Sequence, residues 1–203
     1  MLLSLLPEGT FTTLLNNMRG VSEPNREKLA ELEKKGDWEG VVKFAQESMA
    51  RDPTNPDWHV VAGYAHSQLE RYSRAAEEFQ EAIRLGPEEV DSWNLLAQAY
   101  RSLGQPDRAI RTLEGALQVS RDSAMTYYLL GESFNDVRRP DRAVGFYEQA
   151  VQRDPKFADA VYRLGLTYAR LGRKEDFDGA VKHLERLDPK AAKQLAATPS
   201  SGR

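Results

Sequence analysis

The sequence predicts an all-α protein, a solenoid of helix pairs, and three observations lead to this class. Residues 93–110 read WNLLAQAYRSLGQPDRAI and residues 127–144 read YYLLGESFNDVRRPDRAV, so the chain repeats itself at an offset of 34 residues. Apolar residues recur at helical spacing within each stretch. A Pro-Asp pair then interrupts both patterns. A period of this length is typical of stacked helical repeats.

Extending the offset along the chain predicts five units of two helices each. Apolar residues of the third unit recur at i, i+3, i+4 and i+7 from Trp93, which indicates one face of a helix. Pro106 is well placed at the first position of the second helix, whose inner face carries Ala109, Leu113 and Ala116. The predicted units are residues 22–55, 56–89, 90–123, 124–157 and 158–189.

The repeat resembles a known family. The pattern W-x2-L-G-x2-Y, then A-x3-F, then P over 34 residues is similar to the tetratricopeptide repeat. The fourth unit carries it as Tyr127, Leu130, Gly131, Phe134, Ala143, Tyr147, Ala150 and Pro155. The resemblance covers roughly residues 22–189. It implies a right-handed α-solenoid of about five tetratricopeptide-like helix-turn-helix repeats that binds other proteins.

The ends of the repeat array depart from this pattern. The first unit has Leu29 where a small residue is expected, and the fifth has Phe177 in place of an alanine. Terminal repeats are usually atypical because one of their faces meets solvent. Residues 190–203 begin with KAAKQLAA and are predicted to form a capping helix followed by a frayed tail.

Residues 1–21 form an apolar extension with a predicted helix that starts at Thr10. Phe11, Leu14, Leu15 and Met18 share one face of that helix. One interpretation is a cover for the exposed end of the array. The other is a segment that docks onto another chain or a membrane surface, to which the leucines nearest the start contribute: Leu2, Leu3, Leu5 and Leu6.

Composition narrows the function classes. The chain has 203 residues, a net charge of −3 and no cysteine, so disulfides, thiol catalysis and Cys-ligated metals are excluded. The balanced charge gives no global reason to bind nucleic acid. No apolar run is long enough for a membrane span, and the start does not read as an intact signal peptide. We expect a cytoplasmic protein, or a periplasmic or membrane-associated one if the N-terminus was trimmed.

The sequence shows no catalytic or metal-binding motif. His59 and His66 are seven residues apart, which does not match the i, i+4 spacing of helical metal pairs. His66 also occupies the repeat position of Tyr100, so we expect it to pack. We therefore predict no enzyme activity, no cofactor and no metal.

The resemblance implies where a partner binds. In the family, the first helix of each unit lines a concave groove that binds extended peptides or partner helices. The tyrosines offer rigid apolar area, and the amides offer hydrogen bonds to a peptide backbone. The predicted groove residues are Val60, Tyr64, Asn94, Gln98, Arg101, Tyr128, Glu132, Asn135 and Tyr162.

Arginines that recur at the turns form a possible basic edge: Arg71, Arg74, Arg108, Arg138, Arg139, Arg142 and Arg173. The sequence thus favours a non-catalytic scaffold or adaptor that holds a peptide or helix of another protein. One alternative is an adaptor for nucleic acid, which the overall charge disfavours, or for an anionic membrane, acting through the arginine edge. Another is a self-assembling protein that docks its N-terminal segment into a neighbour's groove.

Overall fold

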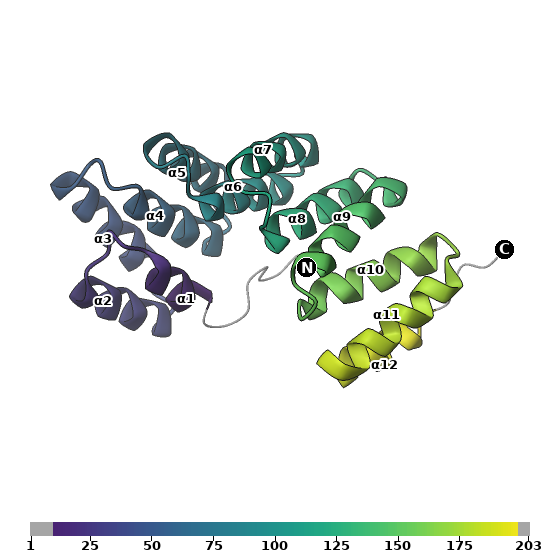
Figure 1. Ribbon diagram of the computed structural model, residues 1–203. Helices are drawn as coiled ribbons and strands as arrows, with labels where there is room; N and C mark the ends of the chain where they lie inside the picture. The colour runs from purple at the N-terminus through teal and green to yellow at the C-terminus, as the bar shows by residue number, and fades with distance from the viewer. Residues whose placement is uncertain (1–9, 199–203) are drawn as a thin grey trace. The chain divides into compact units, whose positions relative to one another are not determined.

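The computed structural model describes residues 10–198, within which the chain forms helices and no strands (Figure 1). It contains two compact units that meet between Gln105 and Pro106. The helices of the first unit are α1 Thr10–Asn17, α2 Glu23–Lys34, α3 Trp38–Arg51, α4 Pro56–Gln68, α5 Tyr72–Leu85 and α6 Val90–Ser102. Those of the second are α7 Pro106–Val119, α8 Ala124–Asp136, α9 Pro140–Arg153, α10 Ala158–Arg170, α11 Lys174–Leu187 and α12 Pro189–Ala196. The prediction of an all-α helical-repeat fold is confirmed.

The turns inside the helix pairs share one backbone conformation. Gly36, Gly104 and Gly172 have φ of 67°, 68° and 68°, and they fall in register with the repeat. Glu70 and Arg138 hold the two remaining places with φ of 56° and 58°. Left-handed backbone suits glycine and is costly for residues with a Cβ. The repeat therefore extends to the backbone, and two of its turns carry strain.

Packing in the first unit depends on one small residue. A Cβ at Gly63 of α4 would lie 2.6 Å from Cε1 of Phe79 in α5, which is too close for any side chain. The glycine lets the Phe79 ring, only 1% exposed, lie directly on the α4 backbone. The same arrangement recurs in the second unit, where a Cβ at Gly131 of α8 would lie 2.6 Å from the Tyr147 ring of α9.

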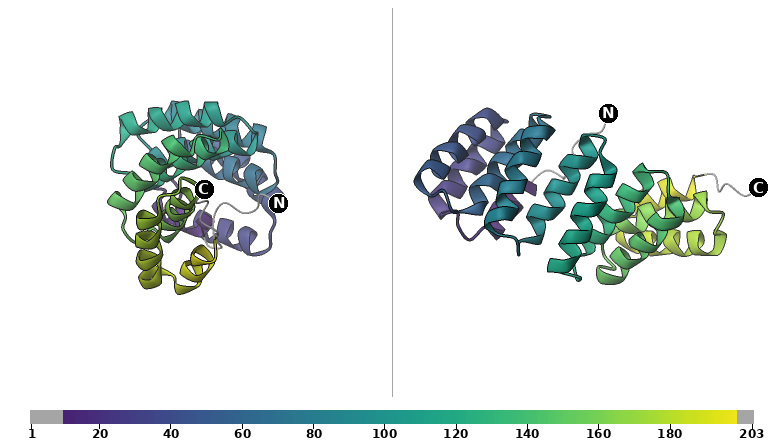
Figure 2. Two further views of the ribbon diagram at one scale, coloured as in Figure 1. Left: turned by 90° about the vertical axis from the view of Figure 1, so that its right-hand side faces the viewer. Right: turned by 90° about the horizontal axis from the view of Figure 1, so that it is seen from above.

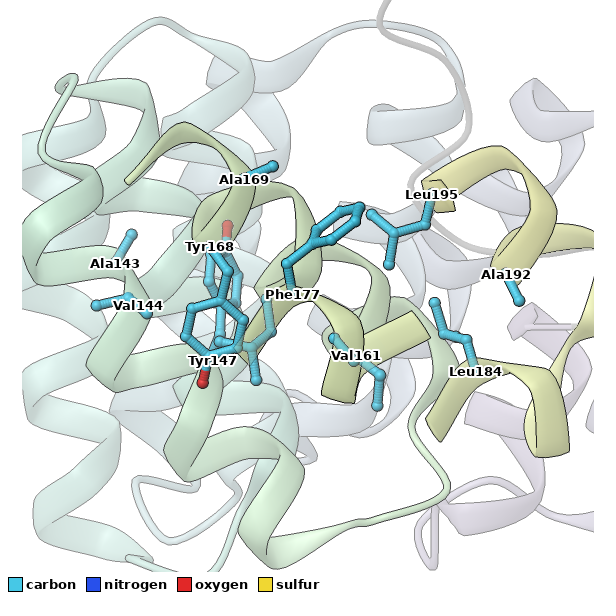
Figure 3. Packing of buried hydrophobic residues seen from close by; sticks show 12 residues of the cluster. Ala143, Val144, Tyr147, Val161, Tyr168, Ala169, Phe177, Leu184, Ala192 and Leu195 are labelled. Atoms are coloured by element: carbon cyan, nitrogen blue, oxygen red, sulfur yellow. The ribbon is translucent and has the colours of Figure 1, made fainter. Parts of the chain in front are cut away.

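The core of the second unit continues to its last helix. Tyr147, Tyr168 and Phe177 lie in one buried cluster with Leu184 and Leu195 (Figure 3). Leu195 belongs to α12, which packs against α10 and α11 (Figure 2). Asp188 begins α12 by accepting hydrogen bonds from two backbone N–H groups. The short helix thus covers apolar surface that α10 and α11 would otherwise expose.

Candidate protein-binding faces

In the first unit, α1 packs on the side of α4 that carries Tyr64. The Phe11 ring is fully buried and stacks on the Tyr64 ring with a centroid distance of 4.8 Å and an interplanar angle of 26°. The Trp38 ring meets Phe11 edge-on at 5.5 Å. We call Phe11, Trp38 and Tyr64 the aromatic cluster. Each such ring pair contributes about 0.5–1.5 kcal/mol beyond area burial.

The rest of α1 and the loop after it are held by apolar contacts and hydrogen bonds. Leu15 and Met18 are 1% and 6% exposed. The Gly20 N–H donates to Oδ2 of Asp57 at 2.7 Å, and the Asn55 side-chain amide donates to the Gly20 carbonyl at 2.9 Å. Both α1 and the loop that follows it are therefore held against the rest of the first unit.

This docking changes the setting of the predicted groove residues in the first unit. Tyr64 is only 5% exposed, because Phe11 covers it, and it does not lie on an open surface. Burial raises the pKa of Tyr64 to about 12, so its phenol stays protonated. Val60 and Asn94 are also buried, whereas Gln98 and Arg101 are partly exposed. The role of these five residues in partner binding stays a prediction.

An acidic pocket of about 550 Å³ lies beside the C-terminal end of α1. Arg19 is the basic residue among those described that line it. Burial raises the pKa of the Asp57 carboxyl, an effect that the Gly20 N–H partly opposes, and burial also raises the pKa of Asp91. A pocket of this composition favours a cationic group. Its acidic lining residues are Asp52, Asp57, Glu88, Glu89 and Asp91.

In the second unit, the buried carboxylate of Glu132 organises the face between α8 and α10. Glu132 is 5% exposed, and the Tyr147 hydroxyl donates to its Oε1 at 2.5 Å. Nε of Arg163 lies 3.3 Å from the same oxygen. Burial and the adjacent Glu132 carboxylate raise the pKa of Tyr147, so its phenol remains a donor. Glu132 therefore acts as an internal anchor within the predicted groove.

Arg163 is a functional candidate that sequence reasoning missed. Its side chain is 43% exposed, while the buried Glu132 carboxylate pairs with it and Tyr128 interacts with it electrostatically. The Tyr128 ring is also fixed, with its centroid 4.9 Å from that of Phe157. Periodicity did not reveal Arg163, because it comes one residue after the predicted groove position Tyr162. The sequence offers one indirect signal, the acidic residue Glu132 at a predicted groove position, which calls for a basic partner.

A groove of about 320 Å³, the α8–α10 groove, opens beside this network. Asn135 accepts a hydrogen bond from Arg170, and both line the groove together with Arg163 and Leu166. Tyr162 is partly exposed and packs against the core of the unit. The groove thus combines two arginines with apolar area, on elements that the core holds rigid.

The predicted basic edge is largely engaged within the chain. Arg71 forms two hydrogen bonds with Glu39, and Arg139 lies 3.5 Å from Asp141. Arg173 pairs with Asp176 at 2.7 Å and with Glu148 at 3.3 Å. The Arg142 guanidinium stacks 5.5 Å from the Phe134 ring centroid. These contacts offset much of the positive charge, while the remaining members are exposed: Arg74, Arg108 and Arg138.

The histidines show packing and pairing. His66 is 6% exposed and its Nδ1 has no hydrogen-bond partner, whereas Nδ1 of His59 lies 2.8 Å from Glu78. Within residues 10–198, no group of three or more His, Asp or Glu side chains is arranged to hold a metal. No helix in this range is long and apolar enough to cross a membrane.

The fold and these faces define an all-α repeat protein of the class that serves as protein–protein interaction scaffolds. The tetratricopeptide repeat model matches residues 60–126, 95–155 and 128–194, which together span more than half of the chain. The chain belongs to the tetratricopeptide repeat family. Members of this family are generally non-catalytic scaffolds.

Solved structures agree with this assignment. TTC0263, a thermophilic TPR protein from Thermus thermophilus, superposes with a TM-score of 0.68 at 16% identity, covering 84% of this chain and 95% of that one. MamA from Desulfovibrio magneticus gives 0.66 at 20%, covering 89% and 99%. YrrB, described as a TPR protein with an unusual peptide-binding site, gives 0.64 at 22%, covering 84% and 89%. At these identities the likeness shows the fold alone. A comparison with curated protein sequences gave no match.

Proposed function

We propose that this protein is a non-catalytic scaffold that binds a peptide or helix of a partner protein on the faces of the first helices of its repeats. The observation that carries the proposal is the α8–α10 groove. There, Arg163 is held by the buried Glu132 carboxylate yet keeps 43% of its side chain exposed. The description of YrrB as having a peptide-binding site supports the same use of the fold.

The groove is suited to recognition because its binding groups are already ordered. A guanidinium held by a buried carboxylate loses little conformational freedom when a partner binds, and that loss is a main cost of association. Leu166 adds apolar area to the groove lining, and Tyr162 precedes it by one turn of α10. Contacts of this kind are consistent with affinities around micromolar, about −8 kcal/mol. Arg163 and Arg170 favour a partner with an acidic side chain near its apolar anchors.

The alternatives have less support. A basic edge for nucleic acid or anionic lipid is weakened by the ion pairs of Arg71, Arg139 and Arg173. Membrane docking through the N-terminal helix is weakened because Phe11 and Leu15 are buried. The leucines that precede residue 10 lie outside the described residues.

Photo-crosslinking tests the proposal. Benzoylphenylalanine replaces Tyr162, which precedes the groove residue Leu166 by one turn of α10, or Gln152 on the exposed side of α9 as a control. We expect a defined protein to crosslink at position 162 in cell lysate and not at position 152. The Arg163→Ala variant should reduce that crosslink at least about tenfold, which corresponds to about 1.4 kcal/mol of binding. Equal crosslinking at both positions would refute groove binding.

A further inference from the structure

The docked α1 shows which partner chemistry fits the first unit. We propose that the face of α4 that carries Tyr64, the α4 face, binds an amphipathic helix with the pattern of α1, and that α1 is the internal occupant that such a helix displaces. The pattern is an aromatic residue, apolar residues four and seven positions later, and a basic residue eight positions later, of which the last two directly follow the end of α1. This inference rests on the proposed function and names the partner class for the first unit.

The aromatic anchor is the first part of the argument. Phe11 is fully buried between Tyr64 on α4 and Trp38 on α3, so its ring fills a site made by other repeats. In a helix of the partner, an aromatic residue would occupy the same site. Leu15, four residues later on α1, and Met18, directly after the last residue of α1, are also buried and continue the apolar pattern. This is the spacing with which amphipathic helices bind grooves.

Charge defines the basic end of the pattern. Arg19 follows Met18 directly and lines the pocket whose other charged lining residues, among those described, are acidic. Arg19 shares the pocket lining with five acidic residues, so the pocket suits a helix with further basic residues at its C-terminal end. Basic groups at that end also interact favourably with the helix dipole.

The short length of α1 favours its displacement. It has 8 residues, with no acidic residue in its first turn and no basic residue in its last turn. Helices of this length are unstable in isolation, so α1 is helical because it is docked. A longer helix with the same anchors would offer more contacts. The face is then regulated, since a partner must compete with a segment of the same chain.

The experiment uses a fluorescent peptide of residues 10–21 as the probe and the full-length chain as the receptor. Fluorescence anisotropy compares wild type, Phe11→Ala and the matched control Asn16→Ala, whose side chain is exposed on α1. Internal competition lowers the apparent affinity of wild type by the fraction of open chains. We expect Phe11→Ala to bind the peptide at least about tenfold more tightly than wild type, and Asn16→Ala to match wild type.

Two peptide variants examine the pattern itself. Phe11→Ala in the peptide should abolish binding, and Arg19→Glu should weaken it about tenfold, with a smaller dependence on salt. Absence of binding of the unmodified peptide to the folded Phe11→Ala chain would overturn the inference. That result would leave the crosslink at position 162 unaffected, so it is distinct from failure of the proposed function.

Hydrogen exchange on wild type provides a readout that needs no variant. Saturating peptide should speed exchange of the α1 amides, and unchanged protection would overturn displacement. Light scattering tests the remaining candidate occupant of the α4 face, a second copy of the chain. A mass that doubles with concentration in wild type but not in Phe11→Ala would assign the face to a second copy of the chain and overturn the partner helix.

Discussion

Tyr64 in the first unit and Glu132 in the second hold the same position in their repeats, yet different groups cover them. The Tyr64 ring is covered by Phe11 from α1. Glu132 is covered by the Tyr147 hydroxyl from α9 and by Arg163 from α10. The repeat position thus sets the direction of a side chain, while the surrounding chain decides whether that side chain is open to a partner.

The groups that cover Tyr64 and Glu132 also differ in what they leave exposed beside them. In the first unit, the apolar cover hides Tyr64 and leaves an acidic pocket beside it. In the second unit, the charged cover leaves Arg163 partly exposed at the α8–α10 groove. The two faces therefore differ in charge, and we expect them to prefer partner segments of opposite sign.

The largest effect should come from removing the aromatic cover. Phe11→Ala deletes a fully buried ring, and the free energy of unfolding should fall by about 3 kcal/mol. All three tryptophans (Trp38, Trp58 and Trp93) lie in the first unit, so their fluorescence in a urea titration reports on that unit. Asn16→Ala should change stability by less than about 0.5 kcal/mol. Equal losses in both variants would contradict the docking of α1.

A smaller loss of stability should follow when one of the groups that cover Glu132 is removed. Tyr147→Phe removes the hydrogen bond to a buried carboxylate and should cost about 1.5–3 kcal/mol, measured by circular dichroism during urea unfolding. Tyr162→Phe on α10 serves as the control, because Tyr162 is partly exposed and should tolerate loss of its hydroxyl. If both variants lose the same stability, the Tyr147–Glu132 bond does not matter.

The free energy of unfolding of the first unit should also depend on pH, through the protonation of His66. Burial lowers its pKa, Arg71 and Arg74 lower it further, and Glu78 and Glu39 oppose them. Because the folded state then binds a proton less readily than the unfolded state, stability is lost as pH falls below about 6.5. The slope is at most about 1.4 kcal/mol per pH unit.

His66→Phe, which places the Phe134-type residue in this repeat position, should remove that slope and raise stability at pH 5 more than at pH 8. Urea titrations followed by tryptophan fluorescence at both pH values measure the difference. Parallel curves for wild type and variant would show that His66 does not titrate on unfolding.

The smallest predicted effect on stability concerns the strained turns, one in each unit. Glu70 and Arg138 have positive φ where the other repeats have glycine. Replacing either with glycine relieves about 1–2 kcal/mol of backbone strain and costs about 0.5–1 kcal/mol in chain entropy, so we expect a gain near 0.5 kcal/mol. Arg139→Gly, at φ −110°, should bring no gain in the same thermal unfolding measurement. A loss at Arg138 would contradict this account.

The sequence predicts the fold well because the fold depends mainly on the spacing of apolar residues along the chain. The 34-residue period and the apolar positions such as Leu130 and Leu164 specify which helix faces pack, and both residues are buried. The turn at residue 138 falls one period after Gly104, although its arginine hides the signal that a glycine would give.

The candidate site was less predictable because it depends on contacts between residues far apart in the chain. Arg163 meets Glu132 only once α8 and α10 lie close together, and no local pattern links the two positions. The spacing places Phe11 on an amphipathic face, but that face does not say where the helix docks. Short helices acquire their place from tertiary packing, which periodicity does not encode.

The most direct test of the central claim is a double-mutant cycle between Phe11 and Tyr64. Free energies of unfolding are measured by tryptophan fluorescence for wild type, Phe11→Ala, Tyr64→Ala and the double variant. If α1 covers the α4 face through this ring pair, the stability lost in the double variant should be smaller than the sum of the two single losses by about 0.5–1.5 kcal/mol. Losses that add within about 0.3 kcal/mol would mean that Phe11 does not rest on Tyr64, and the account of an internally occupied face would be wrong.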